Sequence, residues 1–446
     1  MTKISVGRLP CLPGPAAWNA ILGPAPTRAP LEGRQTADIV VVGAGFAGLS
    51  AARRLTQLEP DAKIAVLEAG RIAESSAGRN SGFMIDLPHE LTSEDYSGEG
   101  DDRPIIALNR MAIAFADEAV AEYQIDTNFF DRAGKVNGAA GAKAETNNAS
   151  YAKHLGTLDE PYEVLDRSEM TKLTGSRHYC SGLYTPGTVM LQPAGYIRGL
   201  AAGLARAGVR IHEESPVVAL EREGDTWQIK TPNGEVSAGR VILTVNGHLE
   251  NFGFEARRLM QVFLYAVMTP ALDPDALARL GGAPRWGVTP SDPMGTTVRR
   301  IDTGQGGNRI VIRTKASVRP GQRVEMSDVS SAARMMQRKF DKRFPQLAGL
   351  RMEYAWAGHL CLTLNSVSVM RQLDRGLFAG CVQNGLGTAR GTLTGIGAAE
   401  LACGVRSKIT DHFTGEARPR RLPPQLFQSI GANALIRLRE WRAREE

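Results

Sequence analysis

The stretch over residues 38–70 restricts the possible folds of this chain more than any other. A short β-branched run, Asp38-Ile-Val-Val-Val42, is followed at once by Gly43-Ala-Gly-Phe-Ala-Gly48. A segment of helical composition comes next, and then a second apolar run, Lys63-Ile-Ala-Val-Leu67, which ends in Glu68. The order of strand, glycine turn, helix, strand and acidic residue is typical of a dinucleotide-binding βαβ unit.

Each glycine of this turn has its own physical role. Gly43 allows the tight turn, Gly45 lets the backbone approach a pyrophosphate, and Gly48 lets the helix and the strand pack closely. The helix N-terminus directs its free N–H groups and its positive dipole end at the phosphates. Glu68 lies 20 residues after Gly48, where a carboxylate accepts hydrogen bonds from ribose hydroxyls. An unphosphorylated ribose is therefore favoured, which means FAD or NAD rather than NADP.

Length, charge and cysteine content limit the class of protein. A chain of 446 residues exceeds one typical core, so two domains are expected. The net charge is +6, but no basic stripe is interleaved with aromatic residues, which disfavours nucleic acid as a partner. The five cysteines are scattered without zinc or redox spacing and indicate reduced thiols in a cytoplasmic protein. No apolar run is long enough to span a bilayer, and prolines interrupt any N-terminal signal region.

Changes in hydrophobic pattern divide the remainder of the chain. We expect a surface arm over residues 1–37 that Trp18 anchors. Residues 259–270, 296–300 and 309–314 read as strands and 327–344 as an amphipathic helix, which indicates an antiparallel sheet inserted into the α/β domain. The expected division is a discontinuous dinucleotide-binding domain over 38–95, 187–256 and 351–415, a substrate domain over 96–186 and 257–350, and an amphipathic segment over 416–446.

Four motifs occur in a characteristic order along residues 30–415. They are Val42-Gly-Ala-Gly-Phe-Ala-Gly-Leu-Ser50, Ala77-Gly-Arg-Asn-Ser-Gly82, Trp356-Ala-Gly-His359 with Thr363, and Gly385-Leu-Gly-Thr388. In this order they resemble the glycine/D-amino-acid oxidase (DAO) family, nearest to its γ-glutamylputrescine oxidase-like branch. The resemblance implies an α/β fold, with a Rossmann-like FAD-binding domain and an inserted antiparallel-sheet (α+β) substrate domain.

The family resemblance also implies a reaction. Its members use FAD to oxidise the C–N bond of a primary or secondary amine, such as an amino acid or a modified polyamine, to an imine, with hydride transfer to flavin N5 and reoxidation by O2. Two alternatives stay open: a dehydrogenase that passes electrons to a quinone or protein acceptor, and a non-catalytic flavin-binding protein. An NAD-dependent dehydrogenase is disfavoured because the chain has no separate nicotinamide-domain signature. The amine, the oligomeric state and any covalent flavin link stay open.

The resemblance implies a set of cofactor contacts. It gives the pyrophosphate to Gly43, Gly45 and Gly48, the adenosine ribose to Glu68, and the adenine to the backbone of Val218. Residues 77–81, which include Ala77, Arg79, Asn80 and Ser81, would follow the flavin edge, and Asn246 and Gly247 would close the site. The second glycine loop, formed by Gly385, Leu386, Gly387 and Thr388, would place N–H groups beside the flavin N1–C2=O region. Reduced flavin carries negative charge in that region. Further expected contacts are Phe46, Ala47, Ala69, Arg71 and Ser76.

Three positions depart from the family pattern. Ala77 stands where Ser is usual, with Ser76 one place earlier. Ala389 occupies the position at which sarcosine oxidase-like members carry a Lys that grips the substrate carboxylate, so this anchor is missing. Cys361 lies one position away from the Cys that attaches FAD in those members, and we expect it to be a buried free thiol.

Four residues are candidates for the catalytic side of the site. Arg79 either contacts substrate or flavin or anchors its own loop. His359 is better explained as a structural or substrate-orienting residue than as a base, because a deprotonated amine needs no strong base. Gln383 either faces the substrate or caps the glycine loop. Arg313 and Lys315 are expected on one face of a strand. If that face covers the flavin, they bind an anionic group or aid oxygen activation. If that face is exposed to water, they form a solvated pair, which is the favoured interpretation.

Small molecules are the expected partners: an amine substrate, and O2 or another electron acceptor. Residues 430–441 are amphipathic and basic. We expect this segment to pack on the protein's own surface, with contact to a membrane surface as the less favoured alternative.

Overall fold

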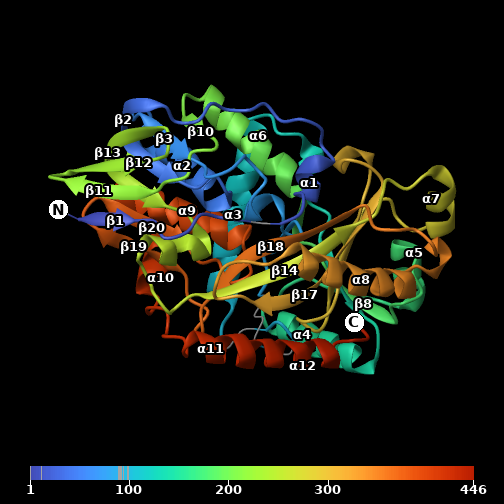
Figure 1. Ribbon diagram of the computed structural model, residues 1–446. Helices are drawn as coiled ribbons and strands as arrows, with labels where there is room; N and C mark the ends of the chain where they lie inside the picture. The colour runs from blue at the N-terminus through green and yellow to red at the C-terminus, as the bar shows by residue number, and fades with distance from the viewer. Residues whose placement is uncertain (1, 12, 89–92, 94, 98–99) are drawn as a thin grey trace.

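The computed structural model describes residues 2–11, 13–88, 93, 95–97 and 100–446. Its first sheet contains the predicted βαβ unit (Figure 1). The hydrogen-bonded order is β1 (Lys3–Ser5), β11 (Ala219–Glu223), β12 (Thr226–Lys230), β13 (Gly234–Leu243), β2 (Gly33–Val42), β3 (Ile64–Leu67) and β10 (Arg210–His212); β20 (Leu377–Cys381) pairs with β13 and with β19 (Val369–Asp374). Strands β20, β13, β2, β3 and β10 are parallel, so their carboxyl ends lie along one edge.

Glycines let two helices approach the centre of this sheet. Helix α2 (Phe46–Leu58) follows β2 through Gly43, whose φ of 103° suits glycine. A Cβ on Gly48 would lie 1.8 Å from the Gly43 carbonyl oxygen, and one on Gly395 would lie 2.1 Å from the Ala47 carbonyl oxygen. Gly395 belongs to α9 (Ala389–Ala402), which therefore packs backbone to backbone against α2, as its small residues predicted.

The core on either side of β2 follows the alternation of a strand. Ile39 and Val41 pack with α2, α9, α3 (Arg103–Glu122) and α6 (Pro193–Arg206), whereas Val40 and Val42 pack with β11 and β12. The parallel strands are thus covered on both faces, and this is the reason their sequences are continuously apolar.

The second sheet has eight strands and lies largely in the second half of the chain. Its order is β18 (Tyr354–Leu362), β14 (Met260–Met268), β17 (Arg309–Val318), β16 (Thr297–Ile301), β15 (Trp286–Pro290), β6 (Lys135–Ala139), β8 (Ser181–Thr185) and β7 (Glu163–Leu165). Neighbouring strands are antiparallel except β15 and β6. Helix α8 (Met326–Arg343) packs against β14, β17 and β18. The predicted strands over 259–270, 296–300 and 309–314 and the helix over 327–344 are confirmed.

Strand β18 belongs to the second sheet, although the expected domain boundaries place it in the first domain. β18 falls within the piece 351–415, which we assigned to the first domain, yet it pairs with β14 from Met260↔Leu362 to Met268↔Tyr354. We propose the two sheets as the cores of two domains, with the crossing back to the first domain after β18.

The remaining elements connect the two sheets. A small third sheet has the order β4 (Phe83–Met84), β9 (Val189–Leu191) and β5 (Phe130–Asp131). The other helices are α1 (Ala17–Ala20), α4 (Ala142–Thr157), α5 (Arg167–Thr174), α7 (Pro274–Leu280), α10 (Lys408–Gly415), α11 (Gln425–Phe427) and α12 (Asn433–Arg442). Trp18 of α1 is fully buried, and its indole N–H donates to the Asn80 carbonyl at 2.9 Å, so it anchors the N-terminal arm as expected. Within the described residues, no helix has the length and apolar character needed to cross a bilayer.

The contact between α2 and α9 predicts a large effect of one methyl group. The change Gly395→Ala places a carbon against backbone that cannot move aside, and we expect it to lower the free energy of unfolding by about 3 kcal/mol, measured by urea denaturation. Gly156→Ala in α4 is the matched control. Its Cβ meets no described atom within 4 Å, so the unfolding free energy should stay equal or rise slightly. Equal effects of the two changes would contradict the close packing.

Candidate functional site

One cavity lies where the carboxyl edge of the first sheet meets the second sheet. It is lined by the first βα turn, the end of β3, the loop after β3, the end of β13, strands β14 and β18, and the loop before α9. The lining includes Val42, Gly43, Gly45, Phe46, Ala47, Glu68, Ala69, Ser76, Ala77, Arg79, Asn80, Ser81, Asn246, Gln383, Gly385, Leu386 and Gly387. The βαβ unit and the second glycine loop therefore open into the same space, as one extended dinucleotide requires.

The end of this cavity at β2 and β3 is suited to an anion. Gly45 is the N-cap of α2, and within the described chain no side chain caps that helix, so the first N–H groups are free for a phosphate. Glu68 is buried, and its carboxylate accepts hydrogen bonds from the Ala44 N–H at 2.8 Å and the Gly70 N–H at 3.2 Å. Burial raises the pKa of Glu68, while these N–H groups oppose the shift.

The loop after β3 is held by its own side chains and by the N-terminal arm. It contains the 3₁₀ turn η1 (Ser76–Gly78). Asn80 donates to the Ala77 carbonyl at 2.6 Å and accepts from the Gly82 N–H at 2.7 Å. Ser76, Ala77, Asn80 and Ser81 all line the cavity, as the family motif predicted.

Arg79 is an anchor between this loop and the arm. Its guanidinium donates to the carbonyls of Glu74 at 2.7 Å, Gly14 at 2.9 Å and Pro13 at 3.2 Å. Burial lowers its pKa to about 10, which still leaves it cationic at neutral pH. Since its donors are bound to backbone oxygens, the structure favours loop anchoring over substrate contact, the two roles that the sequence left open.

Two neighbouring polar residues, Gln383 and Asn384, precede the second glycine loop and have different contacts. The Asn384 side chain accepts from the Thr363 N–H at 2.8 Å and donates to the Val367 carbonyl at 2.8 Å, so it fixes the loop. The Gln383 side chain lines the cavity, and it has no hydrogen-bond partner in the part of the chain that the structure describes. Thr388 lies outside the cavity wall and donates to the Phe83 carbonyl at 2.7 Å.

Arg313 presents a partly buried cation to the cavity. It lines the wall between β14 and β16, and among the described residues its guanidinium has no hydrogen bond or ion pair. Burial lowers its pKa, and the Coulombic interaction with Tyr96 opposes this shift. The favoured interpretation of a solvated pair with Lys315 is therefore wrong for Arg313.

Lys315 does not share the face of Arg313, which also corrects the sequence analysis. The register between β14 and β17 shifts between Leu264 and Tyr265, and Lys315 is the extra residue, with φ 62°. Such a β-bulge breaks the simple alternation of side chains. The Lys315 ammonium lies 5.7 Å from the centre of the Tyr265 ring and outside the cavity lining.

His359 is a neutral residue of the cavity wall. Its Nε2 lies 2.9 Å from the Gln261 Oε1, and its ring centre lies 5.0 Å from those of His248 and Phe263. Burial, with His248 as a smaller cause, lowers the pKa of His359 to about 3, and burial lowers that of His248 to about 4. An imidazole with so low a pKa is a weak base, which supports an orienting role for His359 over that of a general base.

Some expected cofactor contacts lie away from the cavity. Val218 is 36% exposed, its N–H donates to the Lys230 carbonyl and its carbonyl accepts from the Val6 N–H; its neighbour Val217 lines the cavity instead. The expected contact was with the backbone of Val218, whose N–H and carbonyl are both hydrogen-bonded within the protein. Arg71 is exposed and forms an ion pair with Glu214 at 3.4 Å.

Two further glycines of the expected set, Gly48 and Gly247, are absent from the cavity lining but pack next to it. Gly48 packs α2 on the Gly43 turn, as its position in the motif predicted. The Gly247 carbonyl accepts from the Gln261 side chain at 3.1 Å, whereas Asn246 reaches the cavity with a buried Oδ1 that has no partner within the described chain. Thr244, His248, Leu264 and Gly358 also line the cavity and were not expected there; of these four, Gly358 alone lies within one of the sequence motifs.

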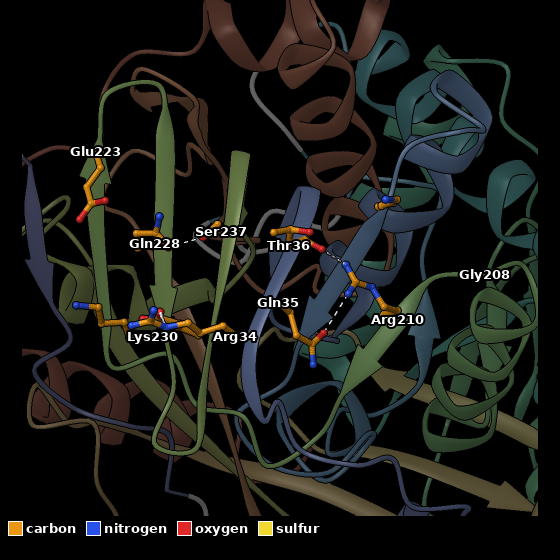
Figure 2. Close-up of a pocket in the computed structure, with 11 residues that line it drawn as sticks. Arg34, Gln35, Thr36, Gly208, Arg210, Glu223, Gln228, Lys230 and Ser237 are labelled. Carbon is orange, nitrogen blue, oxygen red and sulfur yellow. Dashed lines mark hydrogen bonds and ion pairs between the residues drawn. The ribbon is translucent and has the colours of Figure 1, made fainter.

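A second hollow lies at the opposite, amino-terminal edge of the parallel strands (Figure 2). Its side chains bind one another: Arg210 donates to Gln35 at 3.0 Å and to the Thr36 carbonyl at 2.5 Å, and Ser237 donates to Gln228. Ligands of open α/β sheets bind at the carboxyl edge, so the cavity between the two sheets is the candidate site.

The comparisons with known proteins agree with this geometry. The family model described as "DAO: FAD dependent oxidoreductase" matches residues 38–401. The chain is 26% identical to a probable oxidoreductase, OrdL, of Haemophilus influenzae over 85% of this chain and 86% of that one. It is 25% identical to the gamma-glutamylputrescine oxidoreductase of Escherichia coli over 83% and 84%. The crystal structure of glycine oxidase from Geobacillus kaustophilus has the same fold, with a TM-score of 0.68, 18% identity and coverage of 84% and 96%.

The buried histidine predicts a pH-dependent stability. The unfolded chain binds a proton on His359 below about pH 6.5, and the folded chain does so only near pH 3. The free energy of unfolding should therefore be constant above that window and fall as the pH drops, by about 2 kcal/mol from this residue at about pH 5. Urea denaturation across pH should show a smaller slope for His359→Asn than for the unchanged chain. An identical slope in both would contradict the buried neutral state.

Proposed function

The chain belongs to the DAO family of FAD-dependent oxidoreductases, and from that premise we propose that it oxidises the C–N bond of a primary or secondary amine to an imine. One observation carries the proposal: a single cavity is lined by the βαβ unit, by the second glycine loop and by a substrate-side wall from the second sheet. Two proteins that the chain resembles are named for an amine or an amino acid, which supports this class of substrate.

We propose residues of the cavity for each part of FAD. Gly43, Gly45 and the uncapped start of α2 would hold the diphosphate, and Glu68, which its backbone bonds fix in place, would hold the ribose. The N–H groups of the loop over 385–387 would hold the electron-rich edge of the ring. Bound FAD supplies the two-electron oxidant for the amine.

The chain's own residues bind the substrate and control its protonation. The cavity wall excludes water through Phe83, Leu264 and Ala266, and Gln383 offers an amide that can orient a polar group. The partly buried guanidinium of Arg313 opposes a second positive charge nearby, so it favours the neutral amine, whose lone pair the reaction needs. His359 stays neutral and accepts or donates a hydrogen bond without changing charge.

We further propose that the amine carries an anionic group and that Arg313 binds it. The family lysine that grips a carboxylate is absent, with Ala389 in its place. A partly buried cation that lines a cavity without a described protein partner is available to a ligand of opposite charge. A bidentate guanidinium is well matched to a carboxylate.

A screen of amines against the FAD-loaded enzyme without oxygen tests the proposed reaction. At least one amine should bleach the flavin absorbance, because electrons then reside on the cofactor. Admission of oxygen with formation of peroxide identifies an oxidase, whereas reduction of a dye without peroxide identifies the dehydrogenase alternative. Protein without flavin absorbance in excess FAD would contradict flavin binding altogether, whereas bound flavin that no amine bleaches would leave the non-catalytic alternative.

The change Arg313→Gln tests the anion contact. For an amine with a carboxylate, we expect kcat/KM to fall on the order of 100-fold, or about 3 kcal/mol, mainly through KM; for a neutral amine of similar size the loss should be small. Lys315→Gln, two residues along the same strand and outside the cavity lining, is the matched control and should leave both values unchanged. Equal losses for both amines would count against a carboxylate contact.

A further inference from the structure

The C-terminal segment exposes an unusual amount of apolar surface on one side. Figure 1 shows α11 and α12 as a nearly straight rod along one border of the molecule. We define the C-terminal apolar face by five side chains with large exposed fractions: Phe427 67%, Ile430 65%, Leu435 51%, Leu438 44% and Trp441 61%. Leu435, Leu438 and Trp441 follow one another at three-residue spacing in α12, which places them on one side of that helix. Phe427 and Ile430 precede α12, at the end of α11 and in the π-helical turn over Gln428–Ala432. Five exposed apolar side chains within residues 427–441 contrast with the scattered apolar residues that a protein surface normally carries.

The other side of the segment is fixed to the second sheet. Asn433 accepts from the Val318 N–H at 2.9 Å and donates to its carbonyl at 3.0 Å, and Glu440 accepts from the Ala316 N–H at 2.8 Å. The carboxylate of Glu446 accepts from the N–H groups of Ala140 at 2.8 Å and Ser291 at 2.9 Å. These bonds satisfy the free edge of β17 and determine the rotation of the helix, so the apolar face is held outward.

Cations surround this apolar face. Residues 417–444 contain seven arginines and one acidic residue, Glu440, which points inward to β17. Arg437 and Arg442 are exposed and form no hydrogen bond or ion pair with any described residue. Arg444 lies over the Trp441 ring, 4.6 Å from its centre. The outer side of the segment is therefore apolar along its centre and positive along its flanks.

We propose that the C-terminal apolar face binds the surface of an anionic lipid bilayer, with the helix lying flat in the interface. Aromatic and aliphatic side chains would enter the boundary between headgroups and acyl chains, and the arginines would contact lipid phosphates. A second copy of this chain is a poorer occupant, because two such faces would bring together arginines without acidic partners. No described residue of 425–446 lines the active-site cavity, so binding at the C-terminal apolar face leaves that lining untouched.

Vesicle co-sedimentation with the full-length, FAD-loaded chain tests the proposal. The protein should pellet with vesicles of phosphatidylcholine and phosphatidylglycerol, stay in solution with phosphatidylcholine alone, and dissociate as salt is raised. Leu438→Gln with Trp441→Gln should weaken binding by removing apolar contact. Arg437→Gln with Arg442→Gln should weaken it about tenfold or more by removing charge, without any change in packing.

Controls separate lipid binding from loss of structure. Val164→Thr changes another exposed apolar residue, 65% exposed on β7, and should leave vesicle binding unchanged. Flavin content should be equal in all variants. Equal binding to neutral and anionic vesicles, or no binding to either, overturns the proposal. A lipid-free dimer, measured by sedimentation velocity, that the Leu438 and Trp441 changes dissociate would instead assign the face to a second copy.

Discussion

The contact between helix α2 and the turn that precedes it determines the rest of this structure. Gly48 lies so close to the Gly43 carbonyl that any side chain would overlap it, and Gly395 lies equally close to α2 from the other side. Because both contacts involve backbone, they cannot relax by rotation of a side chain. They bring the start of α2, the end of β3 and the loop before α9 to one edge of the sheet, where together they form the wall of one cavity.

The second sheet completes that cavity with a different kind of chemistry. The first sheet contributes N–H groups and one acidic residue, which suit phosphates and a ribose. The second contributes a partly buried cation, Arg313, and a neutral histidine, His359. In the function that we propose, backbone geometry would hold the cofactor and side chains would select the substrate. Changes in the second sheet can alter the substrate while the cofactor contacts stay intact.

Strand β17 connects this site to the molecular surface. Its bulge at Lys315 lies two residues after Arg313, which lines the cavity. Beyond the bulge, the N–H groups of Ala316 and Val318 donate to the side chains of Glu440 and Asn433 in α12. An exposed strand edge is otherwise a point of unwanted pairing, so the C-terminal segment protects it, and the same contacts orient the apolar face that we propose for lipid.

The sequence by itself determined the dinucleotide-binding unit, its cofactor class and the main strands, because these depend on neighbouring residues. Gly43, Gly48 and Glu68 act within one βαβ unit, and their spacing predicts their roles. It did not determine that β18 joins the second sheet, or that Arg79 anchors a loop while Arg313 faces the cavity. Those outcomes depend on contacts between residues far apart in the chain. A one-residue bulge or change of register reverses the direction of a side chain without any signal in the local sequence, so only the tertiary structure decided them.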